Sequence, residues 1–309
     1  MGKIAVDLDH ALARRATSGA PGRTAGQLVA RGDGWSVDDV VCTLGPADRP
    51  FEERHAQVSI GVVVVGSFQY RTPLGRDLMT PGSFLLGNAG QCFECGHEHA
   101  AGDRCVAFRY APDWFDGLAA DAGATRGQRR FRVSRLPPVR ELSALVARAA
   151  AGVVASSNVG WEELAIQVAA TAIRVAGGVR DDRPEAPAGA LARVTAGVRS
   201  IERDPAARWT LHQLATDAGL SPFHYLRTFQ QLTGVTPHQF VLRARLREAA
   251  TRLAQDRAKV IDIALDSGFG DLSNFNRAFR AEFGVAPEGY RRQVGTLVAK
   301  PPLRAAKTP

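Results

Sequence analysis

Two stretches of this chain follow one plan and decide the fold of its last third. They are residues 210–237, TLHQLATDAGLSPFHYLRTFQQLTGVTP, and residues 260–287, VIDIALDSGFGDLSNFNRAFRAEFGVAP. Each begins with a short segment of helical apolar spacing and reaches a glycine, Gly219 or Gly268, which suits a left-handed helix end because it lacks Cβ. A capping residue, Ser221 or Asp271, then predicts the start of a second helix. Each stretch therefore predicts a helix-turn-helix unit.

The second helix of each unit combines an apolar stripe with a polar face. We expect Tyr225, Phe229 and Leu232 to pack inward in the first unit, as Phe275, Phe279 and Phe283 do in the second. For base edges the sequence favours Arg227 and Arg277, with His224 and Asn276, because arginine pairs with guanine and asparagine with adenine. Bases or phosphates are also within the expected reach of Phe223, Ser273, Gln230 and Arg280.

The two units match at many independent positions, which is the signature of an internal repeat. Ala215 corresponds to Ala264, and the equivalences continue through the recognition helices. The further pairs are Gly219 and Gly268, Ser221 and Asp271, Tyr225 and Phe275, Arg227 and Arg277, Phe229 and Phe279, Gly234 and Gly284, and Pro237 and Pro287. A joining helix from about Pro237 to Ala254 would span roughly 27 Å, against about 34 Å between groove segments one turn apart.

This region resembles the DNA-binding domain of the AraC/XylS family of bacterial transcription regulators. The resemblance is carried by Leu214-Ala215, Gly219-Leu220-Ser221, Phe229, Gly234-Val235-Thr236-Pro237, Arg245-Leu246, Ala249, Leu253, Ile263-Ala264, Gly268-Phe269, Phe275, Arg277-Ala278-Phe279, Phe283-Gly284, Pro287 and Tyr290-Arg291. Ala286 departs from the pattern, which usually has Ser or Thr there. The resemblance implies a regulator that binds double-stranded DNA, with a small-molecule effector and RNA polymerase as further partners.

The distribution of charge points the same way. From Pro187 onward there are 18 Lys and Arg against 10 Asp and Glu, an excess of +8, and the whole chain has 39 against 31, also +8. The residues before 187 therefore sum to zero, and the excess positive charge lies in the segment expected to contact a polyanion. A basic segment alone is more often a solvated surface. Together with the tandem repeat it favours nucleic-acid binding.

Composition limits the remaining possibilities. A chain of 309 residues with 45% hydrophobic residues has room for one large or two ordinary domains. No apolar run approaches the ~18 residues of a membrane span. The first ten residues include Asp7 and Asp9 and lack an apolar signal core, so we expect a cytoplasmic protein. Four cysteines in a chain of this size do not predict a disulfide framework.

Between Trp35 and Pro112 the sequence changes to short β-rich runs separated by Gly, Pro and Asp. Several short strands at this spacing predict a small barrel or double-stranded roll. The segment Pro81–Leu86, PGSFLL, resembles a turn and strand of the cupin-like sensor domains that precede this DNA-binding domain in the same family. We therefore expect a cupin-like β-barrel whose interior could hold an effector.

One group of side chains in this region could bind a metal. On a strand, Cys95, His97 and His99 would point the same way, and Cys92 and Cys105 lie nearby in sequence. Thiolates and imidazoles suit zinc or another transition metal. Cys92 and Cys95 could instead form a redox pair. A third possibility puts the histidines in a surface loop and the cysteines in the core.

The rest of the chain divides around these two domains. Residues 1–34 show little pattern and predict a poorly ordered N-terminal arm, and residues 35–176 form the sensor domain. Two amphipathic helices within about 137–176 resemble the family's dimerisation element, which implies a homodimer, although they could also cover the barrel. Residues 177–187 predict a linker, 188–293 the DNA-binding domain, and 294–309 a disordered basic tail.

The sequence thus predicts an α+β chain of two domains that is a sequence-specific DNA-binding regulator and not an enzyme. One alternative is a metal-dependent cupin enzyme, or a metal or redox sensor, fused to a DNA-binding domain. Another is an alkylation-repair protein, which would need four clustered cysteines; Cys42 lies about 50 residues from the others, and this argues against it.

Overall fold

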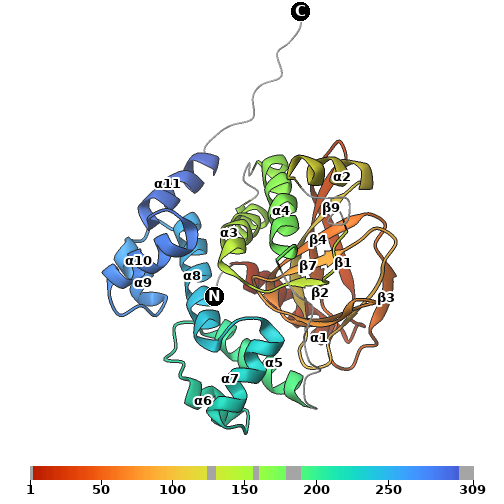
Figure 1. Ribbon diagram of the computed structural model, residues 1–309. Coiled ribbons are helices and arrows are strands. Elements are labelled where there is room, and N and C mark those ends of the chain that lie inside the picture. The colour runs from red at the N-terminus through yellow and green to blue at the C-terminus, as the bar shows by residue number, and fades with distance from the viewer. Residues whose placement is uncertain (1–2, 124–129, 156–159, 179–188, 299–309) are drawn as a thin grey trace, which may run out of the picture.

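The computed structural model shows a β-rich N-terminal part and a helical C-terminal part packed side by side (Figure 1). It describes residues 3–123, 130–155, 160–178 and 189–298. The predicted α+β chain, with a β-rich N-terminal domain and a helical C-terminal domain, is confirmed. Within these ranges no helix is both long and apolar enough to cross a membrane.

The described residues of the N-terminal part form ten strands in two antiparallel sheets. The strands are β1 (Thr24–Gly32), β2 (Trp35–Cys42), β3 (Phe51–Arg54), β4 (Val58–Gly66), β5 (Phe68–Thr72), β6 (Gly75–Met79), β7 (Phe84–Gly87), β8 (Cys92–Gly96), β9 (Asp103–Tyr110) and β10 (Arg135–Leu136). One sheet has the order β1-β2-β9-β4-β7-β10, and the other has β3-β8-β5-β6. No ladder between the described residues closes them into a barrel, so the closed form of the expected barrel is not found.

The layers packed on both sides of the six-stranded sheet explain why strand β4 is almost wholly apolar. β4 reads VSIGVVVVG, and both faces of its first seven residues are buried. Ile60 and Val62 join the core beneath the helices, whereas Val63 joins a second core with Phe68 and Tyr70 of the four-stranded sheet. A strand covered on both faces has no polar alternation, which is why this run is almost wholly apolar.

Three helices cover the outer face of the six-stranded sheet. They are α2 (Pro112–Asp121), α3 (Arg140–Ala155) and α4 (Trp161–Ala176). Leu142 of α3 and Leu164 of α4 are fully buried against the sheet. The Tyr110 hydroxyl at the end of β9 donates to the carbonyl of Ala165 at 2.8 Å. The helices expected in this region therefore cover the domain core, which was one of the two roles considered for them.

Residues 3–34 do not form a poorly ordered arm, and the prediction is wrong for them. They contain α1 (Lys3–Ser18) and β1, which pairs with β2 along its length. Leu8 of α1 is buried, and Arg15 forms an ion pair with Asp48 at 2.7 Å. This segment is held by strand pairing and by contacts with residues distant in sequence. Local apolar periodicity does not predict such contacts.

The C-terminal part consists of seven helices within the described ranges. They are α5 (Ala190–Arg203), α6 (Leu211–Asp217), α7 (Pro222–Thr233), α8 (Pro237–Gln255), α9 (Val260–Asp266), α10 (Leu272–Phe283) and α11 (Pro287–Val298). The two predicted helix-turn-helix units and the joining helix are confirmed. α11 extends to Val298, so the predicted tail from 294 is wrong for its first five residues, and 299–309 lie outside the described residues. Of the predicted linker, 179–187 lie outside them too.

The two parts share an extensive packed boundary. Leu78 of β6 belongs to the core of the first helix-turn-helix unit, and Ala147 of α3 belongs to the core of the second. The Ser143 hydroxyl of α3 donates to Glu282 of α10, which also accepts from Arg243 of α8. The N-terminal domain therefore contacts both units at once.

Gly234 and Gly284 provide a matched test of this boundary. Both end a recognition helix in the left-handed region, with φ of 81° and 78°. A Cβ on Gly284 would meet nothing within 4 Å, whereas one on Gly234 would lie 2.4 Å from Cβ of Pro137. We expect Gly284→Ala to cost ~1 kcal/mol of unfolding free energy from backbone strain, and Gly234→Ala to cost ~1–2 kcal/mol more from overpacking. Urea unfolding of both variants measures the difference, and equal losses would contradict a tight boundary at Pro137.

His55 makes the stability of the sensor domain depend on pH. Its ring is buried, shares a 2.7 Å hydrogen bond with Tyr70 and stacks on Phe93. Burial, with a smaller contribution from Arg109, lowers the pKa of His55 from 6.5 to about 4. Between pH 6.5 and pH 4, His55 is protonated in the unfolded chain but neutral in the folded chain. The free energy of unfolding therefore falls as the pH falls from 6.5 towards 4.

The loss can reach about 3 kcal/mol over the whole interval, since each pKa unit corresponds to about 1.4 kcal/mol. Urea unfolding at pH 6.5 and pH 5.0 should show about 1.5 kcal/mol of it. His55→Gln can keep a hydrogen bond to Tyr70 but cannot titrate, so its free energy of unfolding should fall less over this interval. The same pH dependence in wild type and variant would exclude His55 as the source.

Candidate nucleic-acid interface

The first recognition helix, α7, is built to present one polar face. The Ser221 hydroxyl accepts from the backbone N–H of His224 and caps the helix, and Pro222 occupies the first turn. Tyr225 and Phe229 are fully buried, which fixes the rotation of the helix about its axis. Four predicted contact residues lie on the exposed side: Phe223, His224, Arg227 and Gln230.

Phe223 is the most exposed of the large apolar side chains in the described residues, at 68%. It stands beside His224, with ring centroids 5.9 Å apart. An aromatic ring at the N-terminal end of a recognition helix is placed to contact a thymine methyl group.

The second recognition helix, α10, repeats the arrangement. The Asp271 carboxylate accepts from the N–H of Asn274, and Phe275 and Phe279 are fully buried. The exposed side holds the other four predicted residues, Ser273, Asn276, Arg277 and Arg280. The expected cap, stripe and exposed face are therefore all present.

Asn274 has a role that the sequence did not reveal. Its side-chain oxygen accepts from Nη2 of Arg277 at 3.2 Å. Residues three apart are neighbours on a helix surface, and this bond holds the guanidinium while leaving its other N–H groups exposed. The three-residue spacing of Asn274 and Arg277 is the sequence feature that could have indicated this hydrogen bond. Two exposed side chains at that spacing do not by themselves predict one.

The cationic residues of the two recognition helices differ from three arginines of the joining helix α8. Arg243, Arg247 and Arg252 are used in ion pairs with Glu282, Glu202 and Asp266. Within the described parts of the chain, Arg227, Arg277 and Arg280 form no ion pair with a carboxylate. Their charge therefore remains available to an external anion.

Residues of both units and of the joining helix α8 line one cleft. They include Leu226 of α7, Asn274 and Ala278 of α10, and His238 and Val241 of α8. Both recognition helices therefore border the same cleft, next to α8.

The predicted metal ligands are not the set that the fold brings together. Cys92 and Cys95 lie on β8, where alternation places them on opposite faces. β8 ends at Gly96, so the strand geometry expected to align Cys95, His97 and His99 does not extend to the histidines. His99 is exposed, while Cys105 is buried on β9.

His97 instead lies with two residues that the prediction did not include. Among the residues that the structure describes, one group of at least three His, Cys, Asp or Glu side chains has the spacing of a metal site, and it is Cys42, His97 and Asp103. The predicted ligand set does not include Cys42, and no local pattern points to Asp103.

Comparison with known proteins identifies the family. The family model described as a helix-turn-helix domain matches residues 214–293. PqrA of Proteus vulgaris, a probable transcription factor, is 34% identical over 84 residues, which are 27% of this chain and 68% of PqrA. The chain belongs to the AraC family of helix-turn-helix transcriptional regulators.

Other matches of this AraC-family chain cover a similar fraction of it. A putative AraC-like transcription regulator of Streptomyces lividans is 32% identical over 99 residues, 32% of this chain and 33% of that protein. The crystal structure of a transcriptional regulator from Chromobacterium violaceum, with an AraC-type DNA-binding domain, is 27% identical. It covers 37% of this chain and 99% of that one, with a TM-score of 0.33. The match spans about a third of the length of several curated relatives.

Proposed function

We propose that this AraC-family chain regulates transcription by binding specific sequences of double-stranded DNA through α7 and α10. The observation that carries the proposal is the pair of equivalent capped helices whose exposed faces hold Arg227 and Arg277 with no carboxylate partner in the described chain. Arginine and asparagine at base edges give sequence discrimination, and arginines on phosphate give affinity.

The dimensions of the domain suit two successive major-groove segments. α8 has 19 residues, which corresponds to roughly 28 Å of helix at 1.5 Å per residue. Groove segments one turn apart are about 34 Å apart. The two units at the ends of α8, on one side of it, can therefore reach neighbouring segments on one face of a duplex.

We further propose that the N-terminal domain is a cupin-like sensor. Two facing antiparallel sheets with a tight turn at Pro81-Gly82 agree with a double-stranded roll rather than a closed barrel. Its contacts with both helix-turn-helix units offer a route by which a bound effector could change their relative position.

Homodimerisation and contact with RNA polymerase remain parts of this proposal. α3 is covered by the sheet on one side and by α8 and α10 on the other. α4 keeps an outer face that includes the exposed Ile166, so α4 is the better candidate for a dimer contact. Sedimentation of the wild-type chain and Ile166→Glu would show whether this face pairs.

The central test is selection of genomic fragments by the purified full-length chain, followed by titration of the selected and scrambled duplexes. We expect the selected duplex to bind at least ~1,000-fold more tightly at physiological salt. The affinity should fall steeply with salt, as phosphate contacts release counterions. Equal affinity for both duplexes at all salt concentrations would refute sequence-specific binding.

A further inference from the structure

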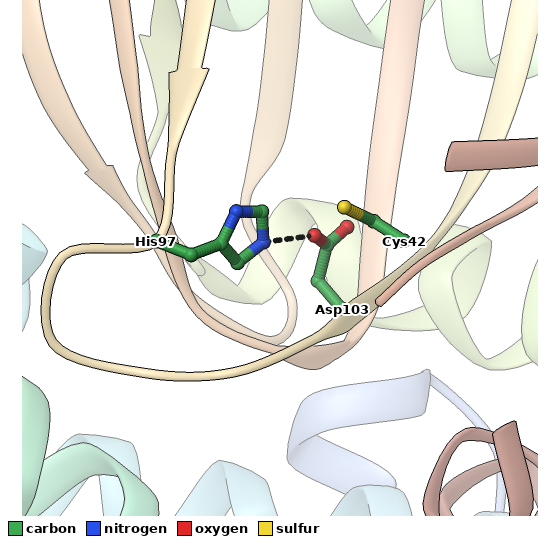
Figure 2. Close-up of side chains that lie close together, drawn as sticks. All are labelled: Cys42, His97 and Asp103. Carbon is green, nitrogen blue, oxygen red and sulfur yellow. Dashed lines mark hydrogen bonds and ion pairs between the residues drawn. The ribbon is translucent and has the colours of Figure 1, made fainter. Parts of the chain in front are cut away.

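A second chemical site lies in the sensor domain, at the end of the six-stranded sheet. Cys42 is the last residue of β2 and Asp103 the first of β9, and these two residues are direct partners across the ladder. His97 follows the end of β8, and the loop from 97 to 102 leads back to Asp103. Figure 2 shows the three side chains converging, with the imidazole directed at the carboxylate and the thiol beside it.

The three ligand atoms lie close enough together to enclose a small cation after a small adjustment. Nε2 of His97 lies 2.7 Å from Oδ2 of Asp103. The ligand atoms of all three residues lie within 4.8 Å of one another. In tetrahedral zinc sites the metal lies ~2.0–2.3 Å from sulfur, nitrogen or oxygen, which puts ligand atoms roughly 3.5 Å apart. Shifts of about 1 Å in the Asp103 and Cys42 side chains would reach that geometry.

These three polar side chains are buried, and burying polar groups costs free energy of folding. Cys42, His97 and Asp103 are exposed by only 4–5%. Burying a carboxylate and an imidazole costs free energy unless they are paired, and a hydrophobic substitute of similar size is often as stable. Their concentration beside the packed core of Val63, Phe68 and Tyr70 therefore favours a ligand-binding role.

A fourth side chain stands next to the three. The Cys105 thiol, two residues along β9 on the same face as Asp103, lies 3.3 Å from Oδ1 of Asp103. It can complete a four-coordinate site, or water can. Two thiolates, an imidazole and a carboxylate are ligands that select zinc over magnesium or calcium.

We propose that Cys42, His97 and Asp103 bind a divalent transition metal of the zinc type, with Cys105 or water in the fourth position. This site differs from the one predicted from sequence, because Cys92 and His99 have no part in it. The competing explanation is a metal-free hydrogen-bonded trio that only stabilises the loop between β8 and β9.

The test is metal titration of the reduced, full-length chain after removal of metal with a chelator. We expect one equivalent of Zn²⁺ to bind and to raise the melting temperature, since a ligand that binds the folded state stabilises it. Co²⁺, used as a spectroscopic probe, should show a thiolate charge-transfer band. Cys42→Ser should weaken that band, because one thiolate ligand is removed, and His97→Gln should weaken Zn²⁺ binding at least ~10-fold.

Cys92→Ser is the matched control, because Cys92 lies on β8 outside the trio and is half-buried. It should bind Zn²⁺ like the wild type. Circular dichroism of each metal-free variant verifies folding, and Asp103→Asn replaces any variant that fails this check. Absence of stoichiometric binding by the wild type would overturn the proposal. So would undiminished binding by Cys42→Ser and His97→Gln, or equal loss in Cys92→Ser.

Discussion

Replacing both Arg227 and Arg277 by alanine should weaken binding to the selected duplex by at least about 30-fold. Each guanidinium is expected to contribute ~1–3 kcal/mol of discrimination at a base edge. The two residues lie on different helices in separate units, so the losses should be roughly additive. Each single variant should also relax specificity at its own position in the site. Titration against the selected duplex and a set of single-base variants measures both effects.

The control must separate loss of contact from loss of charge. Arg174, near the end of α4 in the sensor domain, is exposed. Arg174→Ala removes the same charge and should change affinity less than about threefold at physiological salt, because exposed charges are screened. Asn274→Ala should have an intermediate effect, since it frees the guanidinium that it now holds. A double arginine variant with wild-type affinity and specificity would exclude these residues from the interface.

Replacing Arg135 by alanine should destabilise the chain by about 3–5 kcal/mol, the usual cost of removing one member of a buried ion pair. Arg135 is fully buried. Its Nε donates to Oδ1 of Asp77 at 3.0 Å, and its Nη1 donates to the carbonyl of Thr233 at 2.9 Å. Thr233 is the last residue of α7, so this side chain joins the sensor domain to the C-terminal end of a recognition helix, where a cation is favoured.

Calorimetry and urea unfolding would measure this loss, and Arg109→Ala provides the comparison. Arg109 also pairs with an aspartate, Asp38, but its side chain is 40% exposed. Exposed ion pairs contribute about 0–1 kcal/mol, so this variant should unfold nearly like the wild type. Arg135→Lys should recover only part of the loss, because an ammonium lacks the planar fork that reaches both acceptors. A cost below about 1 kcal/mol for Arg135→Ala would show that the boundary is held elsewhere.

The sequence made the recognition helices predictable because their determinants are local. Ser221 and Asp271 cap the helices, Gly234 and Gly284 end them, and aromatic spacing decides which face is buried. These signals lie within a few residues of the positions they control. Because the unit occurs twice, each of these signals appears twice. The residues outside the buried stripe could then be assigned to the exposed face.

The metal ligands could not be predicted in the same way. Local spacing drew attention to the Cys92–His99 segment, but β8 ends at Gly96 and separates its members. Cys42 and Asp103 meet because β2 and β9 pair in one register. The register of two strands depends on how the whole faces of the sheet pack, and no short sequence pattern predicts it.

The sequence by itself determined the two helix-turn-helix units, their joining helix, the placement of the positive charge and the division into a β-rich and a helical part. Caps, glycines and apolar periodicity act over one or two turns, so they can be read along the chain. Only the tertiary structure decided that residues 3–32 are ordered, that Arg135 binds the end of α7, and that Cys42, His97 and Asp103 meet. Those contacts join segments 6 to 98 residues apart, and they form only when long-range burial and strand pairing bring the segments together.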